Sequence, residues 1–128
     1  MFIRFIVPKQ NRDSHTFAGL FQAAYELRDG TTLDESETAV IQEVLRWFHV
    51  NLPVPKCLKV PENARAVSWF NSQAKEPLTE MWRLVGVLKT YGVPVRVLKT
   101  ADPGTIIYSD KWQVVAKPHK SMRIRRRL

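Results

Sequence analysis

The sequence predicts a small α/β or α+β protein with about five strands in one mixed sheet, three helices mainly on one face and a C-terminal antiparallel hairpin. Apolar patterns follow the order strand, helix, helix, strand, helix, strand, strand, strand, which is typical of these classes. The 128 residues are 45% apolar and 25% charged, as in a soluble domain with a single core. We expect one globular domain over residues 1–118 and a basic, Arg-rich tail over residues 119–128.

The first strand and the first helix are predicted from the N-terminal third of the chain. Residues 1–7 are β-formers that are apolar on both faces except at one arginine, which favours a central strand ending at Pro8. After a polar loop, Asp13 or Ser14 is expected to cap a helix that ends at Gly30. The apolar stripe of this helix consists of Phe17, Leu20, Phe21, Ala24 and Leu27.

A capping box at residues 32–35 predicts the start of the second helix, with Thr32 as the cap and Glu35 reaching back to it. The apolar stripe of this helix recurs at helical spacing and consists of Ile41, Val44, Leu45, Phe48 and Leu52. Three prolines then predict an extended connection over residues 53–63, because proline removes an amide donor and biases its predecessor away from helix.

Residues 66–70 are the next predicted strand. A third helix follows, capped by Asn71 or Ser72, beginning near Glu76 and closed by Gly92. Its apolar stripe has the clearest period in the chain and consists of Leu78, Met81, Trp82, Val85 and Leu88.

The last part of the domain is predicted to be β-structure. Residues 93–99 form a strand, and residues 102–104 (Asp-Pro-Gly) form a turn that requires positive φ at the glycine. Residues 106–108 and 113–115 flank a tight hairpin turn. We expect Asp102 and Asp110 to serve these turns through bonds to backbone amides. The first three strands are expected to be parallel and the last ones antiparallel.

Positive charge collects at the C-terminal end of the chain. Residues 1–90 contain eleven Lys and Arg against ten Asp and Glu, whereas residues 91–128 contain nine against two. The last ten residues hold five of these cations and no acid. Such a block attracts polyanions, so it favours RNA, DNA or an acidic protein as the partner.

The leading hypothesis is a non-enzymatic protein that binds nucleic acid or a nucleoprotein complex. Contacts with the phosphate backbone would dominate, without sequence specificity and with steep salt dependence. Tyr108 and Trp112 lie in the same region, where they either stack on bases or, the favoured reading, fill the core. The predicted contact residues are Arg96, Lys99, Lys111, Lys117, Lys120, Arg123, Arg125, Arg126 and Arg127.

The alternative hypothesis is a protein-interaction module: an accessory subunit, an inhibitor or a homo-oligomer. In this case the basic tail, or the edge of the terminal hairpin, docks on an acidic partner. Ile124 and Leu128 would then act as apolar anchors between the arginines, whereas they would be nearly silent in nucleic-acid binding.

Enzymatic chemistry is weakly indicated. His15 beside Asp13 has the composition of a general base, but it is more simply a solvated first-turn residue. His49 suits the C-terminal end of a helix, and Cys57 suits the docking of the proline-rich connection. No motif for a metal, a phosphate loop or a cofactor is present, so no cofactor is expected.

The single cysteine, Cys57, excludes an intramolecular disulfide and agrees with a reducing compartment. The N-terminal apolar run is too short for a signal peptide or a membrane span. We therefore expect a cytoplasmic protein with no membrane partner.

Overall fold

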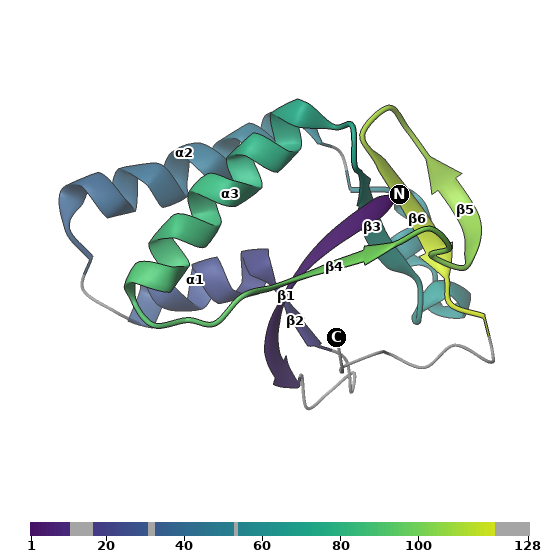
Figure 1. Cartoon of the computed structure of the whole chain (residues 1–128), viewed down its shortest axis with the longest axis horizontal. Helices are drawn as coiled ribbons and strands as arrows, with labels where there is room; N and C mark the ends of the chain where they lie inside the picture. The colour runs from purple at the N-terminus through teal and green to yellow at the C-terminus, as the bar shows by residue number, and fades with distance from the viewer. Residues whose placement is uncertain (11–16, 31–32, 53, 120–128) are drawn as a thin grey trace. The chain divides into compact units, whose positions relative to one another are not determined.

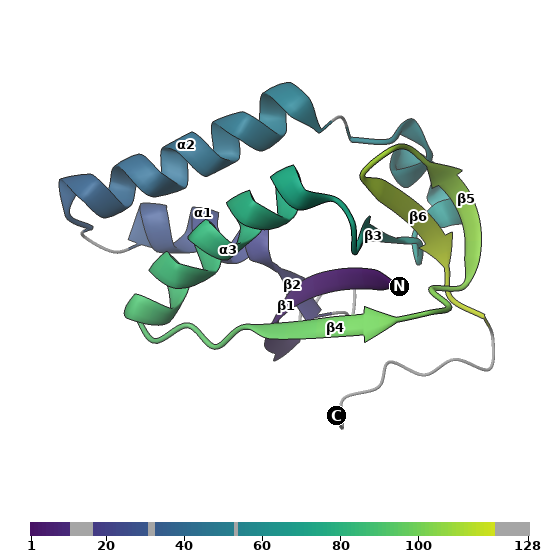
Figure 2. The ribbon, with the colours of Figure 1, turned by 45° about the horizontal axis from the view of Figure 1, so that its top comes forward.

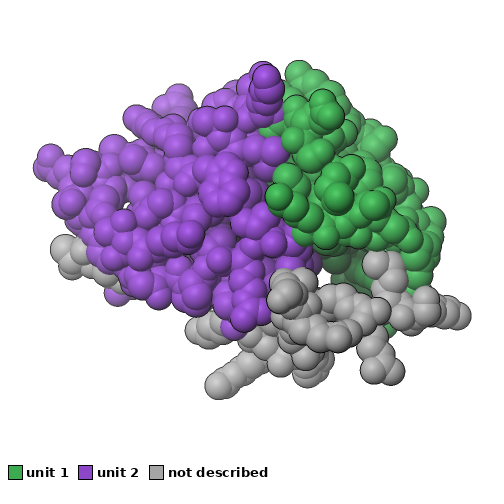
Figure 3. All heavy atoms as spheres, viewed as in Figure 1, with its two compact units in different colours: residues 1–3, 54–74, 99–128 green, residues 4–53, 75–98 purple. Residues whose placement is uncertain are grey.

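The chain divides into two compact units, each made of separate stretches of sequence (Figure 3). The computed structural model describes residues 1–10, 17–30, 33–52 and 54–119. Unit 1 comprises residues 1–3, 54–74 and 99–128, and unit 2 comprises residues 4–53 and 75–98. The expected domain over residues 1–118 stays a prediction, and all of the expected tail except His119 lies outside the described residues.

Strand β1 (Phe2–Gln10) lies between two antiparallel neighbours, β2 (Phe17–Gly19) and β3 (Val67–Asn71). Phe5, Ile6 and Val7 are all buried although successive side chains point to opposite faces, so both faces of the strand are covered, as predicted. The expected end at Pro8 is wrong. The register with β2 shifts between Val7 and Gln10, and such an irregularity accommodates a proline inside a strand.

The sheet has the order β2-β1-β3-β6-β5, and β4 (Arg96–Thr100) also pairs with β1. Strands β5 (Thr105–Ser109) and β6 (Gln113–Lys117) form the predicted C-terminal hairpin. The α+β class with three helices is confirmed. The expected parallel direction is wrong for β1 and β3, which run antiparallel. Apolar patterns predict a strand equally well in either direction, so they carry no information about orientation.

Three helices pack on one another within unit 2 (Figures 1 and 2). They are α1 (Leu20–Gly30), α2 (Glu35–Asn51) and α3 (Lys75–Thr90). Side chains of the predicted stripes form most of this core, and its most fully buried members are Leu20, Ile41, Val44, Leu84 and Leu88.

Three stripe positions differ from the prediction. Leu52 follows the last residue of α2 and is its C-cap in an extended conformation. Phe17 belongs to β2, because α1 begins three residues later. Trp82 is 51% exposed, and its ring meets the edge of Phe5 with centroids 5.1 Å apart. The fully buried side chain on that part of α3 is Leu84, two positions further along the helix.

The predicted capping box of α2 is wrong. Asp34 is the N-cap, and its Oδ1 accepts the amide of Glu37 at 2.8 Å. This hydrogen bond, with a further one from Ser36, lowers the pKa of Asp34. Glu35 is the first residue of the helix and does not reach back to a cap. The expected caps Asp13, Ser14 and Thr32 lie outside the described residues. The expected cap of the third helix at Asn71 or Ser72 is wrong, because α3 begins at Lys75 and its cap position is residue 74.

The predicted end of α3 is confirmed. Gly92 has φ of +77°, and its amide donates to the carbonyl of Lys89 at 3.0 Å. The amide of Val93 reaches back to Leu88 at 2.9 Å, which completes a Schellman motif. At the other end, Pro77 lies in the first turn of the helix, where its missing amide hydrogen leaves no intrahelical bond unmade.

The expected extended connection over residues 53–63 is wrong. This stretch forms two short 3-10 helices, η1 (Lys56–Lys59) and η2 (Pro61–Asn63). Pro55 precedes the first helix and Pro61 begins the second. At these positions a proline presets φ without breaking a hydrogen bond, so the prolines start turns here.

Candidate nucleic-acid interface

The closed end of the β5–β6 hairpin is organised by Asp110. Its Oδ1 accepts the amides of Trp112 and Gln113 at 2.9 and 3.0 Å. Its Oδ2 accepts the hydroxyl of Tyr108 at 2.8 Å and the side-chain amide of Gln113 at 3.1 Å. The expectation that Asp110 serves the turn is confirmed.

These hydrogen bonds also set the ionisation of the cluster. Partial burial acts to raise the pKa of Asp110, but the bonds from Trp112, Tyr108 and Gln113 together lower it. The same contact raises the pKa of the Tyr108 hydroxyl, because ionised tyrosine beside a carboxylate is unfavourable. The Asp110 carboxylate is thus ionised at neutral pH, with its oxygens directed at local donors.

The two aromatic rings of this hairpin are part of its own packing. Tyr108 and Trp112 are both half-buried. The Lys111 ammonium lies 4.2 Å from the centroid of the Trp112 ring, in the range of a cation–π contact. In this hairpin the Tyr108 hydroxyl donates a hydrogen bond to Asp110, and Lys111 lies over the Trp112 ring. Both aromatic side chains are still partly accessible to solvent.

The open end of the hairpin is held by a second aspartate turn. Asp102 Oδ1 accepts the amide of Gly104 at 3.0 Å, and His119 Nε2 lies 3.3 Å from a carboxylate oxygen of Asp102. Gly104 has φ of +114°, as the sequence predicted for the turn. These contacts position residue 119, the point from which the Arg-rich segment continues.

The predicted basic residues of the folded part are divided between the two units. Lys99, Lys111 and Lys117 belong to unit 1, whereas Arg96 lies in unit 2. The first two of these lysines are exposed and Lys117 is half-buried. Lys111 precedes β6 and Lys117 ends it, so the two are separated by the strand, roughly 13 Å at about 3.3 Å per residue. The remaining predicted residues, Lys120, Arg123, Arg125, Arg126 and Arg127, lie outside the described part of the chain.

Charge separates between the two units. Over the described residues, unit 1 contains six Lys and Arg against three Asp and Glu, whereas unit 2 contains eight of each. Residues 120–128 add five cations and no acid to the sequence that follows β6. The positive excess of three in unit 1 and the five cations of residues 120–128 together equal the net charge of the whole chain, +8.

Among the described residues, ion pairs of Lys or Arg with Asp or Glu occur in unit 2 alone, where two arginines form them. In unit 2, Arg83 pairs with Glu43 at 2.7 Å and with Glu80 at 3.0 Å, and Arg28 pairs with the adjacent Asp29. The hydrogen bond to Glu43 makes the largest contribution to the raised pKa of the Arg83 guanidinium. Across the described part of unit 1, no Lys or Arg forms an ion pair with Asp or Glu. Its cations therefore remain available to an external anion.

The candidates for chemistry are dispersed. His49 is exposed in the last turn of α2, as expected for a residue at a helix C-terminus. Cys57 is half-buried in η1, and its carbonyl accepts the Asn63 side chain at 2.9 Å. His15 and Asp13 lie outside the described residues.

Sequence reasoning missed three cations of the basic unit. Lys56, Lys59 and Arg65 are exposed and belong to unit 1, although they lie far from the C-terminal charge block in sequence. Counting charge along the chain does not reveal them, because the negative charges of unit 2 surround this segment in the sequence.

Within residues 1–10, 17–30, 33–52 and 54–119, no cluster of His, Cys, Asp and Glu suits a metal ion, and no helix is long and apolar enough to cross a membrane. Comparison of the chain with protein-family models, curated proteins and solved structures finds no match.

Proposed function

We propose that this protein binds nucleic acid, or a nucleoprotein complex, through the basic face of unit 1 and the Arg-rich segment that follows it. One observation carries the proposal: the described part of unit 1 holds a positive excess in which no Lys or Arg pairs with Asp or Glu, whereas the described part of unit 2 contains equal numbers of basic and acidic residues. No catalytic role is proposed for any residue.

The expected mode of binding is electrostatic. Cations that are not neutralised within the protein replace the counterions condensed on a phosphate backbone, and the released ions supply the driving force. Lys99, Lys111 and Lys117 would contact phosphates from the folded unit, and Lys120, Arg123, Arg125, Arg126 and Arg127 would extend this track. Specificity for base sequence is not expected, since backbone contacts do not report base identity.

The test neutralises the segment without shortening the chain. Replacing Arg123, Arg125, Arg126 and Arg127 with Gln should weaken binding of a fluorescein-labelled 20-nucleotide oligo(dT) at 50 mM salt, measured by anisotropy. The slope of log K against log salt should fall by about 0.7 for each lost phosphate contact with a single strand. Unchanged affinity and slope would refute the proposal.

A second candidate is protein interaction through the edge of the sheet. Strand β5 stands at the end of the strand order and, among the described residues, pairs with β6 alone. It contains no charged residue, and Ile106 is 47% exposed, so it lacks the charges that commonly protect an edge. A partner captured by the full chain after nuclease treatment, and lost in Ile106→Lys, would favour this candidate.

A further inference from the structure

Helix η1 presents two lysines on one side. In a 3-10 helix, residues three positions apart are eclipsed, so Lys56 and Lys59 lie one above the other with a rise of about 6 Å. Both side chains are exposed, whereas the intervening Cys57 and Leu58 are half-buried. Helix η1 therefore directs its apolar side toward the rest of unit 1 and its charged side toward solvent.

A network of backbone bonds holds this turn in shape. Pro55 is buried, and its carbonyl accepts the amide of Leu58 at 3.1 Å. Asn63 binds back from η2, its side-chain amide donating to the Cys57 carbonyl and its backbone amide to Val60, both at 2.9 Å. The two lysines are thus carried by a rigid base, which lowers the entropy lost when they bind a ligand.

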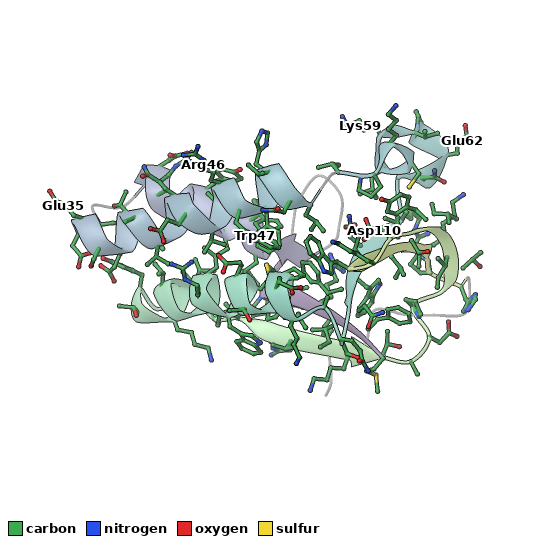
Figure 4. All side chains as sticks on the ribbon, turned by 90° about the horizontal axis from the view of Figure 1, so that it is seen from above. Glu35, Arg46, Trp47, Lys59, Glu62 and Asp110 are labelled. Atoms are coloured by element: carbon green, nitrogen blue, oxygen red, sulfur yellow. The ribbon has the colours of Figure 1, made fainter. Side chains whose placement is uncertain are left out.

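Helix η1 lies beside the β5–β6 hairpin. The pKa of the Tyr108 hydroxyl is raised mainly by the hydrogen bond that it donates to Asp110, and the Cys57 thiol adds a smaller contribution of the same sign. Figures 1, 2 and 4 all show the two turns next to β5 and β6, and Figure 4 labels Lys59 and Glu62 on these turns and Asp110 in the hairpin. Segments about fifty residues apart in sequence therefore share one part of unit 1.

The acids of this region do not neutralise its lysines. Asp110 directs both oxygens to donors within its own hairpin. Glu62 forms no ion pair among the described residues. Two like charges stacked on one side of a turn repel each other, and a bound polyanion relieves this repulsion.

We propose that η1 is a second contact for the nucleic-acid backbone, in which Lys56 and Lys59 bind the phosphates of a strand that also contacts the β5–β6 hairpin at Lys111. This inference rests on the proposed function and extends the basic surface to a segment outside the C-terminal third of the chain.

The experiment compares two double variants of the full chain that lose the same charge. Lys56→Gln/Lys59→Gln removes the proposed contact. Lys75→Gln/Lys89→Gln is the control, since both of these lysines are exposed on α3 in unit 2. Binding of labelled 20-nucleotide oligo(dT) is measured from 50 to 200 mM salt, and circular dichroism checks that each variant is folded.

The expected result is a salt slope smaller by about 1.4 for the η1 variant, two contacts at about 0.7 each, with the slope of the control unchanged. Lys56→Arg/Lys59→Arg, which keeps both charges, should bind like the wild type. Equal slopes for the η1 variant and the control would overturn the inference while leaving binding by the Arg-rich segment intact. If the wild type does not bind at 50 mM salt, the proposed function and this inference both fail.

Discussion

At the closed end of the β5–β6 hairpin, one carboxylate accepts four hydrogen bonds from three residues. Asp110 joins the two strands because its donors come from Tyr108 before the turn and from Trp112 and Gln113 after it. Gln113 is 4% exposed and is the buried polar residue of the described chain. Loss of the carboxylate would remove all four of these hydrogen bonds.

Asp110→Ala should lower the free energy of unfolding by about 1 to 3 kcal/mol, because it removes hydrogen bonds to a charged carboxylate. Urea denaturation at pH 7 measures this change. Asp29→Ala is the matched control, because the Asp29 carboxylate is 67% exposed and pairs with the adjacent Arg28. The control should shift the free energy by less than about 0.5 kcal/mol.

The effect of Asp110 should also depend on pH. Its pKa is lower in the folded protein than the value of about 3.9 expected in the unfolded chain. The stabilisation is therefore complete above pH of about 3.9 and is lost as pH falls through the folded pKa. The difference in stability between wild type and Asp110→Ala should shrink below pH 4, and a constant difference from pH 7 to pH 3 would contradict this assignment.

At the scale of elements, two glycines have opposite roles. Gly104 adopts φ of +114°, and a Cβ built there would lie 2.1 Å from the carbonyl oxygen of Lys117. Gly86 lies inside α3, and a Cβ there would meet no atom within 4 Å. The first glycine is required by the turn before β5, whereas the second only adds flexibility to a helix.

Alanine substitutions at these glycines should therefore change stability in opposite directions. Gly104→Ala should destabilise the protein by more than about 2 kcal/mol, through backbone strain and a clash with rigid main chain. Gly86→Ala should stabilise it by about 0.5 to 1 kcal/mol, because alanine has the higher helix propensity. Thermal and urea unfolding of both variants measure the changes; the same sign in both would be inconsistent with this geometry.

Helices and strands with a strong apolar pattern could be predicted from the sequence. The residues at which they begin and end were harder to predict. The stripes of α2 and α3 were largely correct, because burial on one side imposes a 3.6-residue period. The start of α2 was misplaced by two residues, since Thr32 and Asp34 are both good caps and only the folded backbone selects one. The connection over residues 53–63 was misjudged because proline both ends and begins helices.

At the scale of the molecule, a polyanion that binds only the folded state should stabilise it. At a free concentration one hundred times the dissociation constant, the expected gain is about 2.7 kcal/mol. Oligo(dT) should therefore raise the midpoint of thermal unfolding at 50 mM salt. The variant with Arg123, Arg125, Arg126 and Arg127 replaced by Gln should show a clearly smaller rise; equal rises in both proteins would argue against that segment as a contact.

The amino-acid sequence alone left the α/β and α+β classes open, but it was sufficient to predict a sheet with three helices, the C-terminal hairpin, the turn duties of Asp102 and Asp110 and the charge block near the C-terminus. Each depends on neighbours within a few residues, where period, turn chemistry and local charge act directly. The tertiary structure alone decided that β1 and β3 run antiparallel. It alone placed Lys56, Lys59 and Arg65 in the basic unit with the hairpin. Both outcomes depend on contacts between residues far apart in the chain, and local patterns carry no record of such contacts.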